Sequence, residues 1–392
     1  MKDIYYSHKN ILPFMNGSLK IGTFSGIPIQ LHWTFLIIIP LFAWIIGSQI
    51  LLTTDLIAGI FRVPIDTSIL AAGYMPYILG TIIALGLFGG VLIHELAHSI
   101  MAKSKGIKIN SITLLIFGGI SSMEEETPDP KVELPMAAIG PLTSLVVGIV
   151  CIAIMYLAAG AAAANPAVAG VFVFMFGYLG LLNVFLFGFN LLPAFPMDGG
   201  RVLRAFLARS MPLNKATRIA ADVGKVFAVL FGILGIFLLN PILILIAFFI
   251  YIGASQESTA MKYNFLLKDV TVSDIMATDV RTVSTELPVR DVIDLMYTTK
   301  HLGFPVEEKG HVTGMVTLAD VHKIAPLDRE AMQVRDIMTR GIIALPPKAP
   351  VIDALRIMSG NNIGRIPVME GDQLLGIVTR TDIMKVIELK EM

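Results

Sequence analysis

The sequence is poor in charge and in cysteine. Asp, Glu, Lys and Arg make up 15% of its 392 residues, and the basic and acidic residues balance at 30 each. This balance excludes the basic excess of nucleic-acid-binding proteins, so we expect no nucleic-acid partner. The single cysteine, Cys151, excludes an internal disulfide. The first 25 residues lack a signal-peptide core and cleavage site, which predicts that the first apolar run is an uncleaved span.

Long apolar runs are abundant, but only before about residue 260. The whole chain is 55% hydrophobic, with a mean hydropathy of +0.75, which indicates an integral membrane protein. The predicted spans are 31–52, 77–103, 135–159, 168–192, 220–239 and 242–253. We therefore expect an α-helical six-span membrane domain over 1–260, a linker over 261–271, and a C-terminal α/β module made of repeats 272–325 and 332–392.

Lysine and arginine predict how these spans are oriented. With the N-terminus inside, every even-numbered loop of the six-span arrangement carries basic residues, whereas the outer loops hold only Arg62. Because basic loops stay on the cytoplasmic side, both the N-terminus and the C-terminal module are predicted to be cytoplasmic. The expected location is the cell membrane, as a multi-pass protein.

The motif His94-Glu95-Leu96-Ala97-His98 lies inside the second apolar run. On a helix, His94 and His98 lie about 40° apart around the axis and roughly 6 Å apart along it. Two imidazoles so placed can hold one Zn²⁺, and Glu95 can serve as general base for a water. Ionisable groups at membrane depth are costly, which favours a metal site over an accidental spacing.

Zinc needs at least one more ligand, and the other histidines lie in polar segments or at the mouth of the first span. Asp198 is the carboxylate near membrane depth that stands out, after a Pro-broken helix end and before Gly199-Gly200. The alternative is that Asp198 only caps the helix that follows.

Between the second and third runs, residues 107–117 predict a strand, Gly118-Gly119 a turn, and residues 120–123 a returning strand. A strand edge such as 112–117 could receive an extended peptide by β-addition. We therefore take Phe117, Gly118 and Gly119 as candidate substrate-binding residues in a small membrane-associated hairpin.

The two separated motifs, His94-Glu95-Leu96-Ala97-His98 and Asn190-x-x-Pro193-x-x-Pro196-x-Asp198-Gly199, resemble those of the site-2 protease family of intramembrane zinc metalloproteases. The resemblance covers most of residues 20–260. It implies one zinc per chain held by His94, His98 and Asp198, Glu95 as general base, and Asn190 near the substrate or oxyanion. It also implies hydrolysis of a peptide bond within the single transmembrane helix of a membrane protein substrate.

The C-terminal part contains an internal repeat with an offset of 62 residues, seen where Gly314 to Asp320 aligns with Gly376 to Asp382. The copies resemble tandem CBS domains, which implies binding of an adenine nucleotide (ATP, ADP or AMP), homodimer formation, or both. By position, the candidate ribose-binding residues are Thr317, Asp320, Thr379 and Asp382. The alternative is that both aspartates only cap helices.

Two functions follow from this combination. The first is an intramembrane zinc endopeptidase regulated by the CBS pair. The second is a CBS-gated, metal-binding channel or transporter, in which the two histidines would belong to a metal pathway. The two differ at Glu95, which a protease needs for turnover but not for metal binding.

Overall fold

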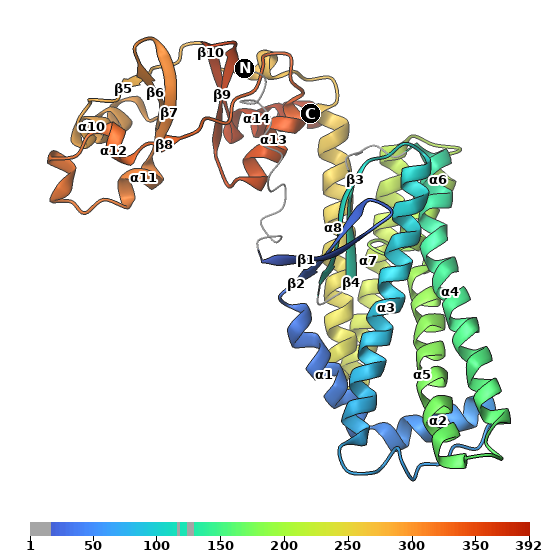
Figure 1. The fold of residues 1–392 in the computed structure, drawn as a ribbon. Helices are drawn as coiled ribbons and strands as arrows, with labels where there is room; N and C mark the ends of the chain where they lie inside the picture. The colour runs from blue at the N-terminus through green and yellow to red at the C-terminus, as the bar shows by residue number, and fades with distance from the viewer. Residues whose placement is uncertain (1–16, 116–117, 124–128) are drawn as a thin grey trace. The chain divides into compact units, whose positions relative to one another are not determined.

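A computed structural model describes residues 17–115, 118–123 and 129–392 and divides them into two compact units, 17–261 and 262–392. The N-terminal unit is helical with one small sheet (Figure 1). Its elements, in chain order, are β1 (Ser18–Phe24), β2 (Ile27–His32), α1 (Phe35–Ser48), α2 (Ile50–Phe61), α3 (Met75–Ser104), β3 (Ile109–Leu115), β4 (Gly118–Met123), α4 (Pro130–Gly160), α5 (Pro166–Asn190), α6 (Asp198–Leu207), α7 (Leu213–Phe237) and α8 (Pro241–Leu267).

Five of the described helices, α3, α4, α5, α7 and α8, are long and apolar enough to cross a membrane. A sixth crossing requires α1 and α2 together, which are bent by 70°. The sequence predicted one straight span here, but polar Ser48 and Gln49 interrupt the run and Gln49 leaves the helical conformation. The last span was predicted to be short, whereas α8 continues as a helix to Leu267 because polar residues after 253 extend it without a Gly or Pro break.

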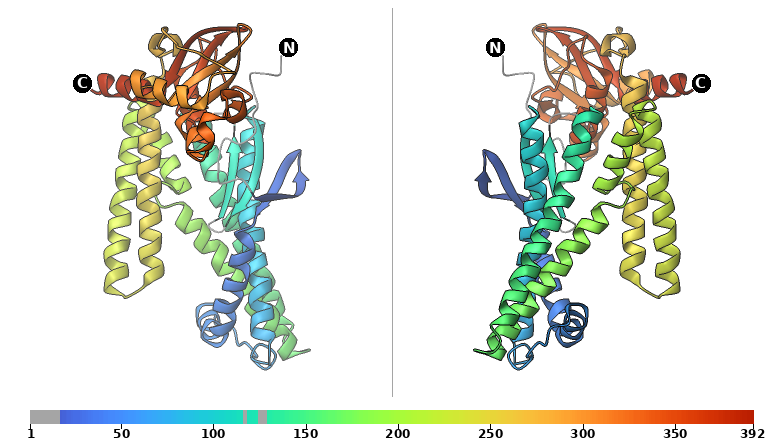
Figure 2. Two further views of the ribbon diagram at one scale, coloured as in Figure 1. Left: turned by 90° about the vertical axis from the view of Figure 1, so that its left-hand side faces the viewer. Right: turned by 90° about the vertical axis from the view of Figure 1, so that its right-hand side faces the viewer.

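Helices α3, α4 and α5 pack side by side and form the centre of the N-terminal unit, while α7 and α8 run antiparallel as a hairpin (Figure 2). Close approach depends on small residues: a Cβ at Gly148 or Gly180 would crowd the other helix of the α4–α5 pair. Much of the outer surface consists of exposed Leu, Ile, Val and Phe side chains, as expected of helices that face lipid.

The sheet has four strands in the order β1-β2-β3-β4, and β1 and β2 were not predicted from the sequence. Strand β2 pairs in parallel with β3 through residues 29–31 and 112–114, and β4 pairs antiparallel with the other side of β3. The expectation that 112–117 offers a free edge is therefore wrong, because both sides of β3 are occupied. The outer strands are β1 and β4. Lys103 at the end of α3 donates to the Ser25 carbonyl at 2.6 Å and ties the β1–β2 turn to that helix.

Gly118 and Gly119 belong to β4, where they pair with Leu115 and Leu114, so the predicted Gly-Gly turn is also wrong. Gly118 still needs to be glycine, because its φ of +132° lies in a region that side chains disfavour. Phe117 lies outside the described residues.

The C-terminal unit contains the two predicted repeats. The first comprises α9 (Val272–Ile275), β5 (Val283–Ser284), α10 (Val289–Thr299), β6 (Gly303–Glu308), β7 (His311–Thr317), α11 (Leu318–His322) and a 3₁₀ turn (Asp328–Glu330). The second comprises α12 (Val334–Ile337), β8 (Thr339–Arg340), α13 (Val351–Gly360), β9 (Arg365–Glu370), β10 (Gln373–Thr379) and α14 (Arg380–Glu391).

The repeats exchange their leading segments. Thr339 of β8 pairs with Met315 in the first repeat, and Ala277, its equivalent 62 residues earlier, pairs with Ile377 in the second. A further hydrogen bond joins two equivalent positions of the repeats, Gly303 and Arg365, which are 62 residues apart. The Arg365 guanidinium donates to the Gly303 carbonyl at 2.7 Å. Each repeat therefore completes the sheet of the other, which is why they fold as one unit.

Candidate metal centre

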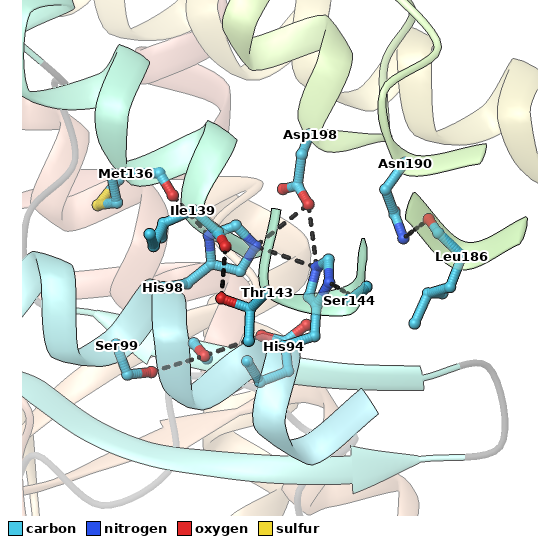
Figure 3. A network of polar contacts seen from close by, with 12 residues as sticks. His94, His98, Ser99, Met136, Ile139, Thr143, Ser144, Leu186, Asn190 and Asp198 are labelled. Carbon is cyan, nitrogen blue, oxygen red and sulfur yellow. Dashed lines mark hydrogen bonds and ion pairs between the residues drawn. The ribbon is translucent and has the colours of Figure 1, made fainter. Parts of the chain in front are cut away.

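The predicted metal ligands come together although Asp198 lies 100 and 104 residues from the two histidines. His94 and His98 project from one face of α3, and Asp198 is the first residue of α6 (Figure 3). Asp198 Oδ2 lies 3.1 Å from His94 Nε2 and 3.1 Å from His98 Nε2, and the two nitrogens are also 3.1 Å apart. Among the described residues, these three make up the one group of His, Cys, Asp or Glu suited to a metal ion.

The three donor atoms fit zinc. Ligand atoms about 2.0–2.1 Å from a tetrahedral zinc lie about 3.3 Å from each other, and an equilateral triangle with 3.1 Å sides allows a point at bonding distance from all three corners. His94 and His98 are 5% and 8% exposed, so solvent does not compete for them.

The outer nitrogens of both rings have partners that set the ring orientation. His98 Nδ1 donates to the Met136 carbonyl at 2.6 Å, and His94 Nδ1 lies 2.9 Å from Ser144 Oγ. A carbonyl only accepts, so the proton of a neutral His98 ring is at Nδ1 and its Nε2 presents a lone pair. That lone pair faces a carboxylate and a second imidazole nitrogen, an arrangement that a cation stabilises.

Asp198 is not the N-cap of α6, which was the alternative at sequence level. The cap position belongs to Met197, and the Asp198 carboxylate meets the two histidines instead. Because its partners are ring nitrogens from another helix rather than backbone N–H groups of α6, this carboxylate is suited to a metal.

Glu95 lies next to the ligands on α3 and is held by the sheet. Ser121 of β4 donates to Glu95 Oε2 at 3.0 Å, and Ser99 Oγ lies 3.0 Å from Ser121 Oγ. Gly119 borders the same carboxylate, because a Cβ there would overlap the Glu95 side chain. Strand β4 therefore contacts the predicted general base directly.

The other predicted site residues have local partners. Asn190 Nδ2 donates to the Leu186 carbonyl of its own helix at 2.9 Å (Figure 3). Thr317 and Asp320 form a capping box on α11, and Thr379 and Asp382 form one on α14. In both, the threonine is the cap and the aspartate returns to its backbone N–H at 3.0 Å, so the capping alternative describes their geometry.

Sequence reasoning missed the residues that support the ligands: Ser99, Ser121, Met136 and Ser144. Hydroxyls and a carbonyl carry no motif, and these come from elements whose contacts with α3 appear only in three dimensions. Gly140 of α4 also belongs to the surroundings of the site, because a Cβ there would overlap the His98 ring.

Comparison with known proteins identifies the families to which the two parts of the chain are similar. The model of peptidase family M50 matches residues 82–165 and 157–231, and the CBS domain model matches 272–326 and 334–389. A zinc metalloprotease of Methanocaldococcus jannaschii is 33% identical over 380 residues, covering 96% of this chain and 99% of its own. The Mycobacterium tuberculosis protein Rip3 is 30% identical over 388 residues, covering 96% and 94%.

Among solved structures, the site-2 protease of Methanocaldococcus jannaschii is 35% identical, with a TM-score of 0.42, over 62% of this chain and 95% of that one. The family and relatives are those of peptidases, which overturns the channel or transporter alternative. Zinc metalloprotease relatives imply Zn²⁺ for a donor set that fits it. With similarity along almost its whole length to a named zinc metalloprotease, the chain belongs to peptidase family M50, as a multi-pass zinc metalloprotease of the site-2 protease type with two CBS domains.

Proposed function

We propose that this protein hydrolyses a peptide bond within the transmembrane helix of a membrane protein substrate. In this proposal His94, His98 and Asp198 are the zinc ligands and Glu95 is the general base. The observation that carries it is the equal spacing of three donor atoms, 3.1 Å apart, two of them on the largely apolar helix α3 with Glu95 beside them. Such groups are costly at membrane depth unless they have a chemical role.

When bound, zinc supplies Lewis acidity for the scissile carbonyl and lowers the pKa of a water. The chain supplies the proton transfers: Glu95 takes the proton of the attacking water and returns it to the leaving amine. The Ser121 hydroxyl fixes the direction of the Glu95 carboxylate. Asn190 is proposed to stabilise the oxyanion, which requires its amide to leave Leu186 and turn toward the substrate.

A transmembrane helix must unwind before its peptide bonds can be cleaved. Strand β4 is an outer strand of the sheet and contacts Glu95 through Ser121 and Gly119. We therefore place the unwound substrate on β4 rather than on the strand predicted from sequence, with Gly118 and Gly119 near it; Phe117 stays a candidate from the sequence alone. Pairing along β4 brings the backbone of the substrate beside the general base.

The location proposed from sequence is the cell membrane, with the N-terminus and the CBS pair in the cytoplasm. The basic residues that support it are Lys103, Lys105, Lys108, Lys131, Arg201, Arg204, Arg209, Lys215, Arg218 and Lys225. The CBS pair is proposed to regulate cleavage by binding an adenine nucleotide through Thr317, Asp320, Thr379 and Asp382, and to mediate a homodimer. The support is the family match and the two equivalent Thr–Asp pairs.

The decisive experiment compares purified full-length wild type with Glu95→Gln, using zinc content and cleavage of a single-span model substrate. Glu95→Gln is expected to retain one zinc per chain and to lose cleavage by about 10²–10⁴-fold, the usual contribution of a general base. Asp222→Asn, which removes an exposed carboxylate on α7, should behave as wild type. Undiminished cleavage by Glu95→Gln would refute the assignment.

Nucleotide binding has its own test. Isothermal titration of AMP and ATP into the full-length protein should show binding that Asp320→Ala and Asp382→Ala together abolish. Absence of binding by the wild type would remove the proposed sensor role and leave only dimerisation, which sedimentation measures.

A further inference from the structure

A buried ion cluster lies beside the metal centre, on the same helix as Asp198. Arg204 of α6 is 4% exposed and Glu133 of α4 is fully buried. Arg204 Nε donates to Glu133 Oε1 at 2.9 Å, and its Nη2 contacts the same oxygen. Its Nη1 donates to Glu257 Oε1 of α8 at 2.6 Å. One guanidinium therefore joins three helices.

Stability alone does not explain such a cluster. Burying an arginine and two carboxylates carries a desolvation cost that apolar side chains of similar volume would avoid. Buried ion pairs are better suited to fixing one arrangement of the elements that they join. The relevant question is therefore which arrangement depends on Arg204.

Arg204 bears on the position of Asp198 relative to the two histidines. Both histidines come from α3, so their mutual geometry is set by a single helix, whereas Asp198 comes from a separate segment. Helix α4 connects the two parts: Met136 accepts from His98, and Glu133, one turn earlier, accepts from Arg204. The cluster thus anchors α6, through its last turn, to the helix that also orients His98, and Asp198 is the first residue of the same α6.

Helix α8 touches the same segment at two points one turn apart. Gly253 packs against Pro196, because a Cβ there would overlap the proline ring, and Glu257 binds Arg204. The Arg204 guanidinium also lies 5.0 Å from the centre of the Phe195 ring. The residues just before Asp198 therefore contact Arg204 and one face of α8, in addition to α7 at Gly224.

We propose that Arg204 is a positioning residue for Asp198, and that Glu257 is the residue through which α8 controls this position. This inference rests on the proposed ligand set. Helix α8 runs without a break from Glu257 to Leu267, and the C-terminal unit begins at Lys262. The contact thus lies on the helix that leads into the CBS domains, five residues before the C-terminal unit begins.

The test uses full-length protein loaded with Co²⁺, whose visible absorption reports ligand geometry without any substrate. Glu257→Gln removes one charge but keeps the size of the side chain, which is 34% exposed. It is expected to retain one Co²⁺ per chain, to shift the d–d absorption bands, and to lower kcat about three- to tenfold with KM unchanged. Asp222→Asn on α7, whose ion pairs are exposed, is the matched control and should leave both readouts unchanged.

A double-mutant cycle then tests the route. Arg204→Lys keeps the charge but not the forked contact with two carboxylates. If Glu257 acts through Arg204, adding Glu257→Gln to Arg204→Lys changes the spectrum and kcat little further. Independent, multiplicative effects would contradict the inference, as would a Glu257→Gln protein with wild-type spectrum and kcat. Because that variant keeps the buried Arg204–Glu133 pair, it tests the idea even if Arg204→Lys does not fold.

Failure of the ligand set is distinguishable from failure of this inference. If Asp198→Ala keeps the wild-type Co²⁺ spectrum, the ligand set is wrong. If Asp198→Ala loses that spectrum while Glu257→Gln keeps it together with wild-type kcat, only the role of Arg204 and Glu257 is wrong.

Discussion

The metal centre and the two CBS repeats both use an aspartate at a helix start, with opposite results. Asp320 and Asp382 are the third residues of α11 and α14 and return to the N-cap threonine of their own helix. Asp198 is the first residue of α6, and its carboxylate faces two histidines from another helix. The CBS aspartates have hydrogen-bond partners within their own helices, whereas a carboxylate that faces two imidazole nitrogens from another helix is suited to a cation.

The largest effect is expected when Asp198 itself is removed. Asp198→Ala deletes a predicted ligand. Loss of a residue that only hydrogen-bonds a ligand lowers metal affinity about 10–100-fold, and the loss here should be larger. Metal content after dialysis and cleavage rate measure it. Asp382→Ala is the matched control in the other region and should leave metal content unchanged. Full metal occupancy in Asp198→Ala would contradict the difference between Asp198 as a ligand and Asp382 as a capping residue.

Space around the histidines is expected to matter next. Gly140→Ala places a methyl group where the His98 ring lies, so the ring must move, and a misplaced catalytic group can cost about 100-fold in rate. Gly89→Ala on α3 meets no neighbouring atom and is the control. Equal cleavage rates for the two variants would show that the site tolerates a displaced His98.

A smaller effect is expected from the partner of His94. Ser144→Ala removes the hydroxyl at His94 Nδ1, which should weaken metal binding about tenfold, the low end for an outer partner. Thr143→Val removes the adjacent hydroxyl, which donates to its own helix at the Ile139 carbonyl, and should leave metal affinity unchanged. Competition with a chromogenic chelator measures both, and similar affinities would deny Ser144 a special role.

The smallest effect is expected in the CBS repeats. Thr379→Ala removes one capping box and should destabilise α14 by about 1 kcal/mol. Hydrogen exchange of the α14 amides in the full chain measures the loss, and metal content serves as the internal control. A change in metal content with Thr379→Ala would mean that the CBS repeats influence metal binding.

One pH effect sharpens the same comparison. Asp274 forms a capping box at the start of α9, as Asp320 and Asp382 do on their own helices. Hydrogen bonds from the Thr271 side chain and backbone lower the pKa of Asp274. A lowered folded-state pKa gives stability that is present above the unfolded pKa and lost as the pH falls through the folded value. The protection factors of the α9 amides, which are corrected for the intrinsic pH dependence of exchange, should therefore fall in acid, and Asp274→Asn should remove that fall. Unchanged pH dependence in Asp274→Asn would refute this cause.

Several features were readable from the sequence because they depend on local pattern. The spacing of His94 and His98 follows from helix geometry, the apolar runs predict spans, and the 62-residue offset predicts paired domains. The predictions that were wrong, the free strand edge and the Gly118-Gly119 turn, concern strand pairing, which depends on residues far apart in the chain. The sheet acquires its first two strands from residues 18–32, and one of them closes the edge of β3 that the sequence left open.

By itself, the sequence determined the two motifs, the apolar runs and the repeat, because these follow from the periodicity of helices and the cost of ionisable groups in lipid. Only the tertiary structure decided that Asp198 is not a cap, because its orientation depends on how α6 meets α3 and α4. It also decided that Ser121 holds Glu95 and that Arg204 joins α4, α6 and α8. Those contacts cross 26 to 71 residues of chain, and no local pattern encodes them.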